Sequence, residues 1–202
     1  MNAEKETISE SFKPKKIEIA DLEHLSSVLL DNGTPLDLWG TGGAKTVENL
    51  FDEITNKEAR LFINKKGEIE RHIETTLVEV IYIAKDVTVY GLKEQKQVFK
   101  DGSFVERKLP TTFEERVKYG ESPKDIGINL VSEGLNIDSP DEFMEFRSRT
   151  EIKPSYSYPG LTTHNQTHPY MTPIDEKDFK PDGYIKIEPD KTSYYAWDFV
   201  IG

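Results

Sequence analysis

The stretch that most constrains the fold is residues 120–137, which read GESPKDIGINLVSEGLNI. Ser122 is a residue type that caps helices, because its hydroxyl oxygen can accept a hydrogen bond from a backbone N–H of the first turn. Pro123 suits the first helical position, and Asp125 stands three residues after the cap, at the capping-box position. The sequence therefore predicts a helix that begins at Pro123.

The same stretch carries an apolar face and a stop signal. Ile126, Leu130 and Val131 recur at helical spacing, so one side of the helix is suited to pack on a core. Gly134 and Asn136 are residue types through which a chain leaves a helix in left-handed conformations. A helix of about three turns that ends in a loop is expected.

The order of residues in this stretch resembles the loop-helix-loop box of the Nudix family, whose pattern is G-x5-E-x7-R-E-U-x-E-E-x-G-U, with U apolar. With Ile137 on the last apolar position, three other residues match: Glu121 falls on the first Glu, Val131 on the central apolar residue and Glu133 on the first member of the Glu-Glu pair. The resemblance implies an α/β protein, a Nudix-like α/β/α sandwich in which helices flank a mixed β-sheet.

The chain departs from this pattern at the positions that carry the chemistry. The same register puts Glu115 at the first Gly, Asn129 at the Arg, Leu130 at the Glu of Arg-Glu, Gly134 at the second Glu of the pair and Asn136 at the last Gly. In that family the box glutamates hold a divalent metal, usually magnesium, against a diphosphate. Magnesium demands near-octahedral oxygen coordination, so a helix reduced to the Glu133 carboxylate is expected to bind it poorly.

Three further runs are similar to a group of Nudix-like proteins. They are WGTGGAKT at residues 39–46, KQVFKDGSFVERKLP at residues 96–110 and SYPGL at residues 157–161. The first run is not a P-loop, because Ala44 precedes Lys45 where G-x-x-x-x-G-K-[ST] requires glycine. We interpret it as a glycine-rich helix entry, and the resemblance then extends from about residue 38 to residue 197.

Helical periodicity and capping residues predict the other helices. One helix is expected from about Asp21 to Asn32-Gly33, and a second from Lys45 or Thr46 onward. A third is expected within residues 139–152, where a capping box precedes apolar residues. Residues 113–119 are interpreted as a linker with some helical character.

Alternation and turn residues predict the strands. Residues 71–84 give the strongest signal and are apolar on both faces near the centre, as in a central strand covered on two sides. Residues 59–63 suit an edge strand, and Asp101-Gly102 suits the turn of a hairpin. Two last strands are expected on either side of residues 189–191.

Charge and composition limit the classes of partner. The chain has 202 residues with 26 Lys and Arg against 37 Asp and Glu, a net charge of −11, so its average field repels nucleic acid. General nucleic-acid binding is not expected, whereas a small nucleotide ligand remains open. The sequence carries no indication of oligomeric state.

Cysteine content and apolar patterning bear on location. Without cysteine the chain has no disulfide and no thiolate ligand for zinc. The first residues lack the apolar core of a signal peptide, and no run approaches the roughly 20 apolar residues of a membrane helix. We expect a cytoplasmic protein with a flexible tail at residues 1–16, a single Nudix-like domain at residues 17–202 and no membrane partner.

Candidate site residues follow from the box and its neighbours. Glu121 and Glu133 are the candidate catalytic carboxylates. The candidate ligand-binding residues are Arg107 and Lys108, for a phosphate, and Tyr156 and Tyr158, for stacking on a base. His164 and His168 are four apart, but in a strand or loop and without a third ligand type at fixed spacing, so no zinc site is expected.

The sequence leaves three functions open. We hypothesise a catalytically degenerate Nudix-like protein that needs no cofactor and binds a nucleotide or nucleoside-diphosphate derivative, or acts as a regulatory or interaction domain. The alternative is an active pyrophosphohydrolase that holds Mg²⁺ or Mn²⁺ with non-standard carboxylates: Glu114, Glu115, Glu121 and Glu133. The third is a structural partner without ligand, favoured if the protein's own aromatic side chains fill the space opposite the box helix.

Overall fold

The computed structural model describes residues 14–107 and 109–201. The chain divides into two compact units, the first formed by Met1–His72 with Ile152–His164 and the second by Ile73–Glu151 with Asn165–Gly202. The sequence predicted a single domain over residues 17–202. Most of the predicted tail at residues 1–16 lies outside the described residues, and its last two residues belong to the first strand.

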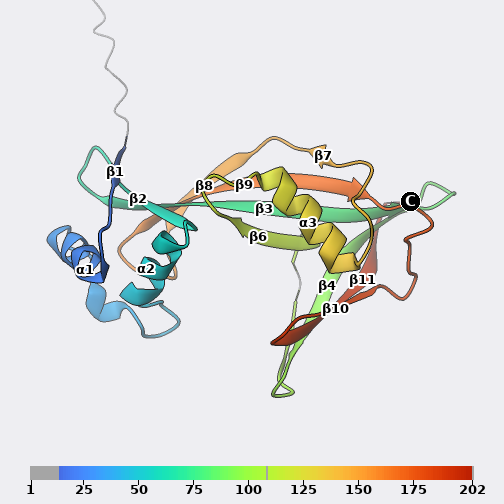
Figure 1. Cartoon of the computed structure of the whole chain (residues 1–202), viewed down its shortest axis with the longest axis horizontal. Coiled ribbons are helices and arrows are strands. Elements are labelled where there is room, and N and C mark those ends of the chain that lie inside the picture. The colour runs from blue at the N-terminus through green and yellow to red at the C-terminus, as the bar shows by residue number, and fades with distance from the viewer. Residues whose placement is uncertain (1–13, 108, 202) are drawn as a thin grey trace, which may run out of the picture. The chain divides into compact units, whose positions relative to one another are not determined.

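The first unit combines a small antiparallel sheet with helices. Strand β1 (Lys15–Ile17) pairs with β2 (Ala59–Ile63), which neighbours the start of β3 (Ile69–Ile83). Figure 1 shows helices α1 (Leu22–Asp31) and α2 (Val47–Thr55) beside these strands, joined by a 3-10 turn at Leu36–Leu38.

The helices of the first unit begin where their capping residues predict. The Asp21 side chain accepts a hydrogen bond from the His24 backbone N–H at 2.8 Å. Thr46 and Asn49 form a reciprocal capping box at the start of α2. Trp39 is buried, and its indole N–H donates to the Pro159 carbonyl at 2.9 Å, so the segment that enters α2 is anchored in the core of the first unit. The core around it consists of Leu25, Leu29, Leu50, Leu61, Ile69, Tyr158 and Leu161.

The second unit is built on a larger sheet. Its strands follow the order β3, β4 (Val89–Phe99), β11 (Lys191–Ile201) and β10 (Tyr184–Ile187). Further pairs join β5 (Phe104–Glu106) to β4, β6 (Phe113–Val117) to β3, and β7 (Met144–Glu145), β8 (Arg149–Pro154) and β3 to β9 (Thr162–Pro173). The strand pairs whose registers are described run antiparallel. Helix α3 (Pro123–Leu135) packs against β6, as Figure 1 shows. The predicted α/β class is confirmed.

The strand predictions hold well in this unit. The long strand expected at residues 71–84 is β3, and the hairpin between β4 and β5 turns at Gly102, whose φ of 82° favours glycine. The two terminal strands are β10 and β11. Buried residues from the sheet and α3 form the core: Val78, Val80, Leu92, Phe113, Val131, Leu135, Tyr170, Ile174, Tyr184 and Tyr195.

Two local predictions are wrong. The helix expected within residues 139–152 is absent, and β7 and part of β8 stand there instead. Met144 pairs with Met171 of β9, while the Phe143 ring packs on Tyr170 at 5.0 Å, so strand pairing overrides the capping signal. Residues 113–117 are strand β6 rather than a linker, because they pair with the central residues of β3. Across the described part of the chain, no helix is long and apolar enough to cross a membrane.

Candidate functional site

Helix α3 forms as the box-like stretch predicts. The Ser122 hydroxyl accepts a hydrogen bond from the Asp125 backbone N–H at 3.3 Å, and Pro123 occupies the first turn. Asn136 ends the helix in a left-handed conformation with φ of 52°. The predicted helix is therefore present, with its cap at Ser122 and its end at Asn136.

The space beside two glycines of α3 is filled by aromatic side chains. A Cβ at Gly134 would lie 2.5 Å from the ring of Phe113, which is 5% exposed and packs on Tyr195 at a centroid distance of 5.3 Å. A Cβ at Gly127 would lie 2.8 Å from the ring of Phe143. Real Cβ atoms do not approach other atoms so closely, so neither position accepts a side chain unless its neighbour moves.

The other altered position of α3 also faces the core. Leu130, which stands where the box has glutamate, packs against the buried cluster that contains Val131 and Leu135. Glu133, the surviving glutamate of the pair, is exposed. The inward side of α3 is thus an apolar packing surface, and Glu133 belongs to the solvent-facing side.

The four carboxylates of the hydrolase alternative are not gathered. Glu121 is exposed, and its carboxylate accepts a hydrogen bond from the Lys118 backbone N–H at 3.3 Å. Glu114 and Glu115 are exposed residues of β6 that line a cavity of about 130 Å³. Over residues 14–107 and 109–201, no three of these four have carboxylate oxygens within 4.8 Å of one another.

Arg107 lines the same cavity and a second one of about 270 Å³. Its Nε lies 3.1 Å from a carboxylate oxygen of Glu94, whose side chain is 5% exposed. Gln97 donates a hydrogen bond to the other oxygen of Glu94 at 2.8 Å. Burial, followed by the charge of Glu94, raises the pKa of Tyr195 in the smaller cavity. Lys108, the second predicted phosphate ligand, lies outside the described residues.

The other cations of the smaller cavity are paired as well. Lys186 and Lys191 lie 3.2 and 3.7 Å from the carboxylate oxygens of Glu188. In the larger cavity, Lys93 lies 2.7 Å from Glu79. Among the described residues that line these two cavities, carboxylates therefore already neutralise the positive groups that a diphosphate would need.

The two tyrosines predicted to stack on a base differ in burial. Tyr156 is 81% exposed, whereas Tyr158 is fully buried in the core of the first unit. The Tyr158 hydroxyl donates to a carboxylate oxygen of Glu53 at 2.9 Å, and its ring packs on Trp39 at 5.1 Å. Tyr158 is a core residue, so the predicted stacking role does not fit it.

Glu53 is a buried carboxylate that the sequence did not single out. Arg71 donates to it through Nε at 2.9 Å, and the Lys45 ammonium lies 2.8 Å from its other oxygen. Burial works against ionisation of Glu53, but the charges and hydrogen bonds of Arg71 and Lys45 outweigh it and lower the pKa of this carboxyl. The cluster ties α2 to β3 in the first unit through the Arg71–Glu53 pair.

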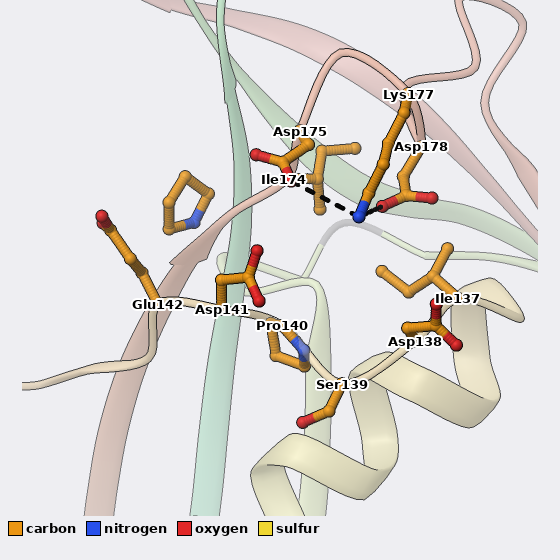
Figure 2. Close-up of a pocket in the computed structure, with 11 residues that line it drawn as sticks. Ile137, Asp138, Ser139, Pro140, Asp141, Glu142, Ile174, Asp175, Lys177 and Asp178 are labelled. Carbon is orange, nitrogen blue, oxygen red and sulfur yellow. Dashed lines mark ion pairs between the residues drawn. The ribbon is translucent and has the colours of Figure 1, made fainter.

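A third cavity, of about 220 Å³, lies beyond the end of α3 (Figure 2). Its charged lining is almost entirely acidic: Asp138, Asp141, Glu142, Asp175 and Asp178, with Lys177. Lys177 lies 3.7 and 4.0 Å from Asp175 and Asp178, and Figure 2 shows its ammonium between them. Such a lining repels phosphate, so this cavity does not suit a nucleotide.

One cluster with the donor types of a metal centre lies in the first unit. Glu70 and His72 are two apart on β3 and so share a face, and His164 comes from the neighbouring strand β9. The ligand atoms of these three residues all lie within 4.8 Å of one another. Glu-x-His on a strand is a weak local signal, and nothing in the sequence brings residue 164 to it, so the cluster was missed.

Short-range electrostatics set the ionisation of this cluster. Burial opposes ionisation of Glu70, but hydrogen bonds with Asn64 and His72 outweigh it and lower the pKa of the carboxyl. Burial also lowers the pKa of His72, against the effect of Glu70. His168 does not join the cluster, since four residues along a strand span about 13 Å, and it lies instead 3.1 Å from Glu74.

Comparisons with known proteins give only a distant likeness. No family model matches the chain, and no curated protein matches its sequence. Among solved structures, a crystal structure of C. elegans Ap4A hydrolase is similar with a TM-score of 0.34 and 11% identity, over 63% of this chain and 80% of that one. A binary complex of a C. elegans Ap4A hydrolase gives 0.34 and 8%, over 64% and 80%. A likeness this weak carries no functional argument.

Proposed function

We propose that this chain is a catalytically degenerate Nudix-like protein that acts as a regulatory or interaction domain and does not hydrolyse diphosphates. One observation carries the proposal. The ring of Phe113 occupies the place of a side chain at Gly134, so the helix frame is kept while a metal-holding carboxylate is sterically excluded.

The hydrolase alternative lacks support in the geometry. Magnesium needs several oxygen ligands within about 2.1 Å, from carboxylates and substrate phosphates together. Glu121 and Glu133 are exposed, and Glu114 and Glu115 line a cavity next to Leu130 rather than next to a further carboxylate of α3. A metal-bound water is therefore not expected beside this helix.

A second candidate is the binding of a nucleotide or nucleoside-diphosphate derivative. The observation that favours it is Arg107, which lines two cavities of the second unit, donates to Glu94 through Nε and has a side chain that is 37% exposed. Against it stands the pairing of the neighbouring lysines with carboxylates. This candidate predicts a ligand that displaces or adds to the Arg107–Glu94 pair.

Thermal-shift screening against nucleoside diphosphate derivatives, with and without Mg²⁺, separates these functions. A ligand that binds only the folded form raises the melting temperature. The interaction-domain proposal predicts no shift and no Mg²⁺-dependent release of phosphate. A shift that disappears in Arg107→Gln but persists in Lys85→Gln, an exposed charge of the same unit, would establish the second candidate instead. Turnover abolished by Glu133→Gln would contradict both.

A further inference from the structure

The side chains of His72 and His164 converge on one carboxylate oxygen of Glu70. Oε2 of Glu70 lies 3.3 Å from Nε2 of His72 and 3.3 Å from Nε2 of His164. In a tetrahedral zinc site with bonds of roughly 2.1 Å, neighbouring ligand atoms are about 3.4 Å apart. Two of the three separations in the cluster therefore already match those of bound ligands.

From this geometry we propose that Glu70, His72 and His164 form a binding site for a divalent transition-metal ion, with Zn²⁺ as the expected occupant. Two imidazoles and one carboxylate are a set that holds zinc in open, three-ligand sites. Imidazole suits zinc, copper, iron and nickel, whereas magnesium prefers a shell of oxygens. The inference concerns the first unit and does not depend on the function proposed for α3.

The surroundings of Glu70 orient its carboxylate for this role. Asn64 donates through Nδ2 to the other carboxylate oxygen, Oε1, at 3.0 Å, so Oε2 is turned toward the histidines. The Phe62 ring packs on His72 at a centroid distance of 4.3 Å and limits the rotation of that imidazole. Partners of this kind fix the ligands of metal sites and raise affinity.

The burial of the three side chains suits a site that an ion can enter. Glu70 is 9% exposed, and the side chains of His72 and His164 are 26% and 18% exposed. Nε2 of His164 is buried and makes no hydrogen bond to any described residue, although it faces Glu70 Oε2. A buried imidazole nitrogen without a hydrogen bond is costly, and a metal ion would satisfy it.

One adjustment accompanies binding. The two imidazole rings are stacked, with centroids 4.3 Å apart and planes within 8° of parallel. The lone pair of an imidazole nitrogen lies in the plane of its ring, so the lone pairs of two stacked rings do not point to one metal ion. The rings must therefore tilt about their terminal side-chain bonds. Such bonds have broad rotational wells, and the tilt falls mainly on His164 because the Phe62 ring packs on His72. Three protein ligands leave a fourth position for water.

A competing description treats the cluster as closed, with Glu70 accepting hydrogen bonds from both histidines and no ion bound. Zinc titration of the full, tag-free chain distinguishes the two. Equilibrium dialysis with metal analysis is expected to give one Zn²⁺ per chain, in the presence of excess Mg²⁺. His72→Gln and His164→Gln are expected to weaken binding by more than about tenfold, and Asn64→Ala by about tenfold.

His168→Gln is the matched control, because His168 lies on the same strand and pairs with a glutamate but has no second histidine beside it. Its zinc affinity is expected to equal that of the wild type. Co²⁺ substitution in the wild-type chain provides a measurement that needs no variant, since visible absorption bands of a four-coordinate ion would appear. Absence of zinc and of cobalt bands in the wild type, or equal affinity in His164→Gln, would overturn the proposal.

Discussion

The carboxylates of α3 and those of the first unit lie in opposite environments. Glu121, just before α3, and Glu133, on α3, are exposed. Among the described residues, no histidine or third carboxylate converges on them. Glu53 and Glu70 are buried on separate elements, and each is held by a cationic or imidazole group from another element, Arg71 for Glu53 and His164 for Glu70. The ligand atoms that lie close together here come from two strands, β3 and β9. The exposed glutamates at α3 have no such second element that brings donor groups to them among the described residues.

A glutamate placed at Gly134 of α3 should disrupt the structure. Gly134→Glu forces a side chain and a charge against the Phe113 ring, so we expect a loss of about 3–5 kcal/mol in the free energy of unfolding. Urea denaturation measures it. Asn129→Glu, at an exposed position of the same helix, is the control and should change little. A Gly134→Glu protein of wild-type stability would show that the Phe113 packing has been misjudged.

Removal of the buried carboxylate of the first unit should be nearly as costly. Glu53→Ala leaves the Arg71 guanidinium buried without its carboxylate, for which we expect about 3–5 kcal/mol of destabilisation. The adjacent Asp52→Ala removes an exposed carboxylate from the same helix and serves as the control in the same denaturation series. Similar losses in both variants would contradict the special role of the Glu53 cluster.

The pH dependence of stability tests the role of the Glu53 carboxylate. The pKa of Glu53 is lowered below its ordinary value of 4.5 in the folded state, so the unfolded state binds the proton more readily. Its stabilisation is therefore present above that value and is lost as pH falls through the lower, folded pKa. We expect the stability difference between wild type and Glu53→Gln to shrink steadily on acidification below about pH 4.5. A difference independent of pH would refute the assignment.

The smallest effect is expected at the surviving box glutamate. Glu133→Gln alters an exposed side chain, so the free energy of unfolding should change by no more than about 0.5 kcal/mol. Mg²⁺ should leave the melting temperatures of both proteins unchanged. A Mg²⁺-induced stabilisation seen only in the wild type would reveal an ion at Glu133.

Signals from neighbouring residues predicted helices and strands such as α3 and β3. They failed where the local structure depends on pairing between strands that are distant in the sequence. Ser122 and Pro123 fixed the start of α3, and the alternation of residues 71–84 fixed β3, because capping and periodicity are properties of neighbouring residues. The helix expected at residues 139–152 failed because pairing with β9 overrode its capping box.

The candidate sites show the same limit more strongly. The altered residues of the box were visible in the sequence, but the ring that fills the place of a side chain at Gly134 comes from Phe113, on another element. His164 joins Glu70 and His72 only through the neighbouring strands β3 and β9, across more than 90 residues of chain. No spacing rule links residues so far apart.

Anomalous diffraction from crystals soaked in Mn²⁺ and in Zn²⁺ tests the central contrast most directly. We expect Zn²⁺ between Glu70, His72 and His164 and no Mn²⁺ peak on α3. A well-occupied Mn²⁺ ion bound by Glu133 together with Glu114, Glu115 or Glu121 would contradict it.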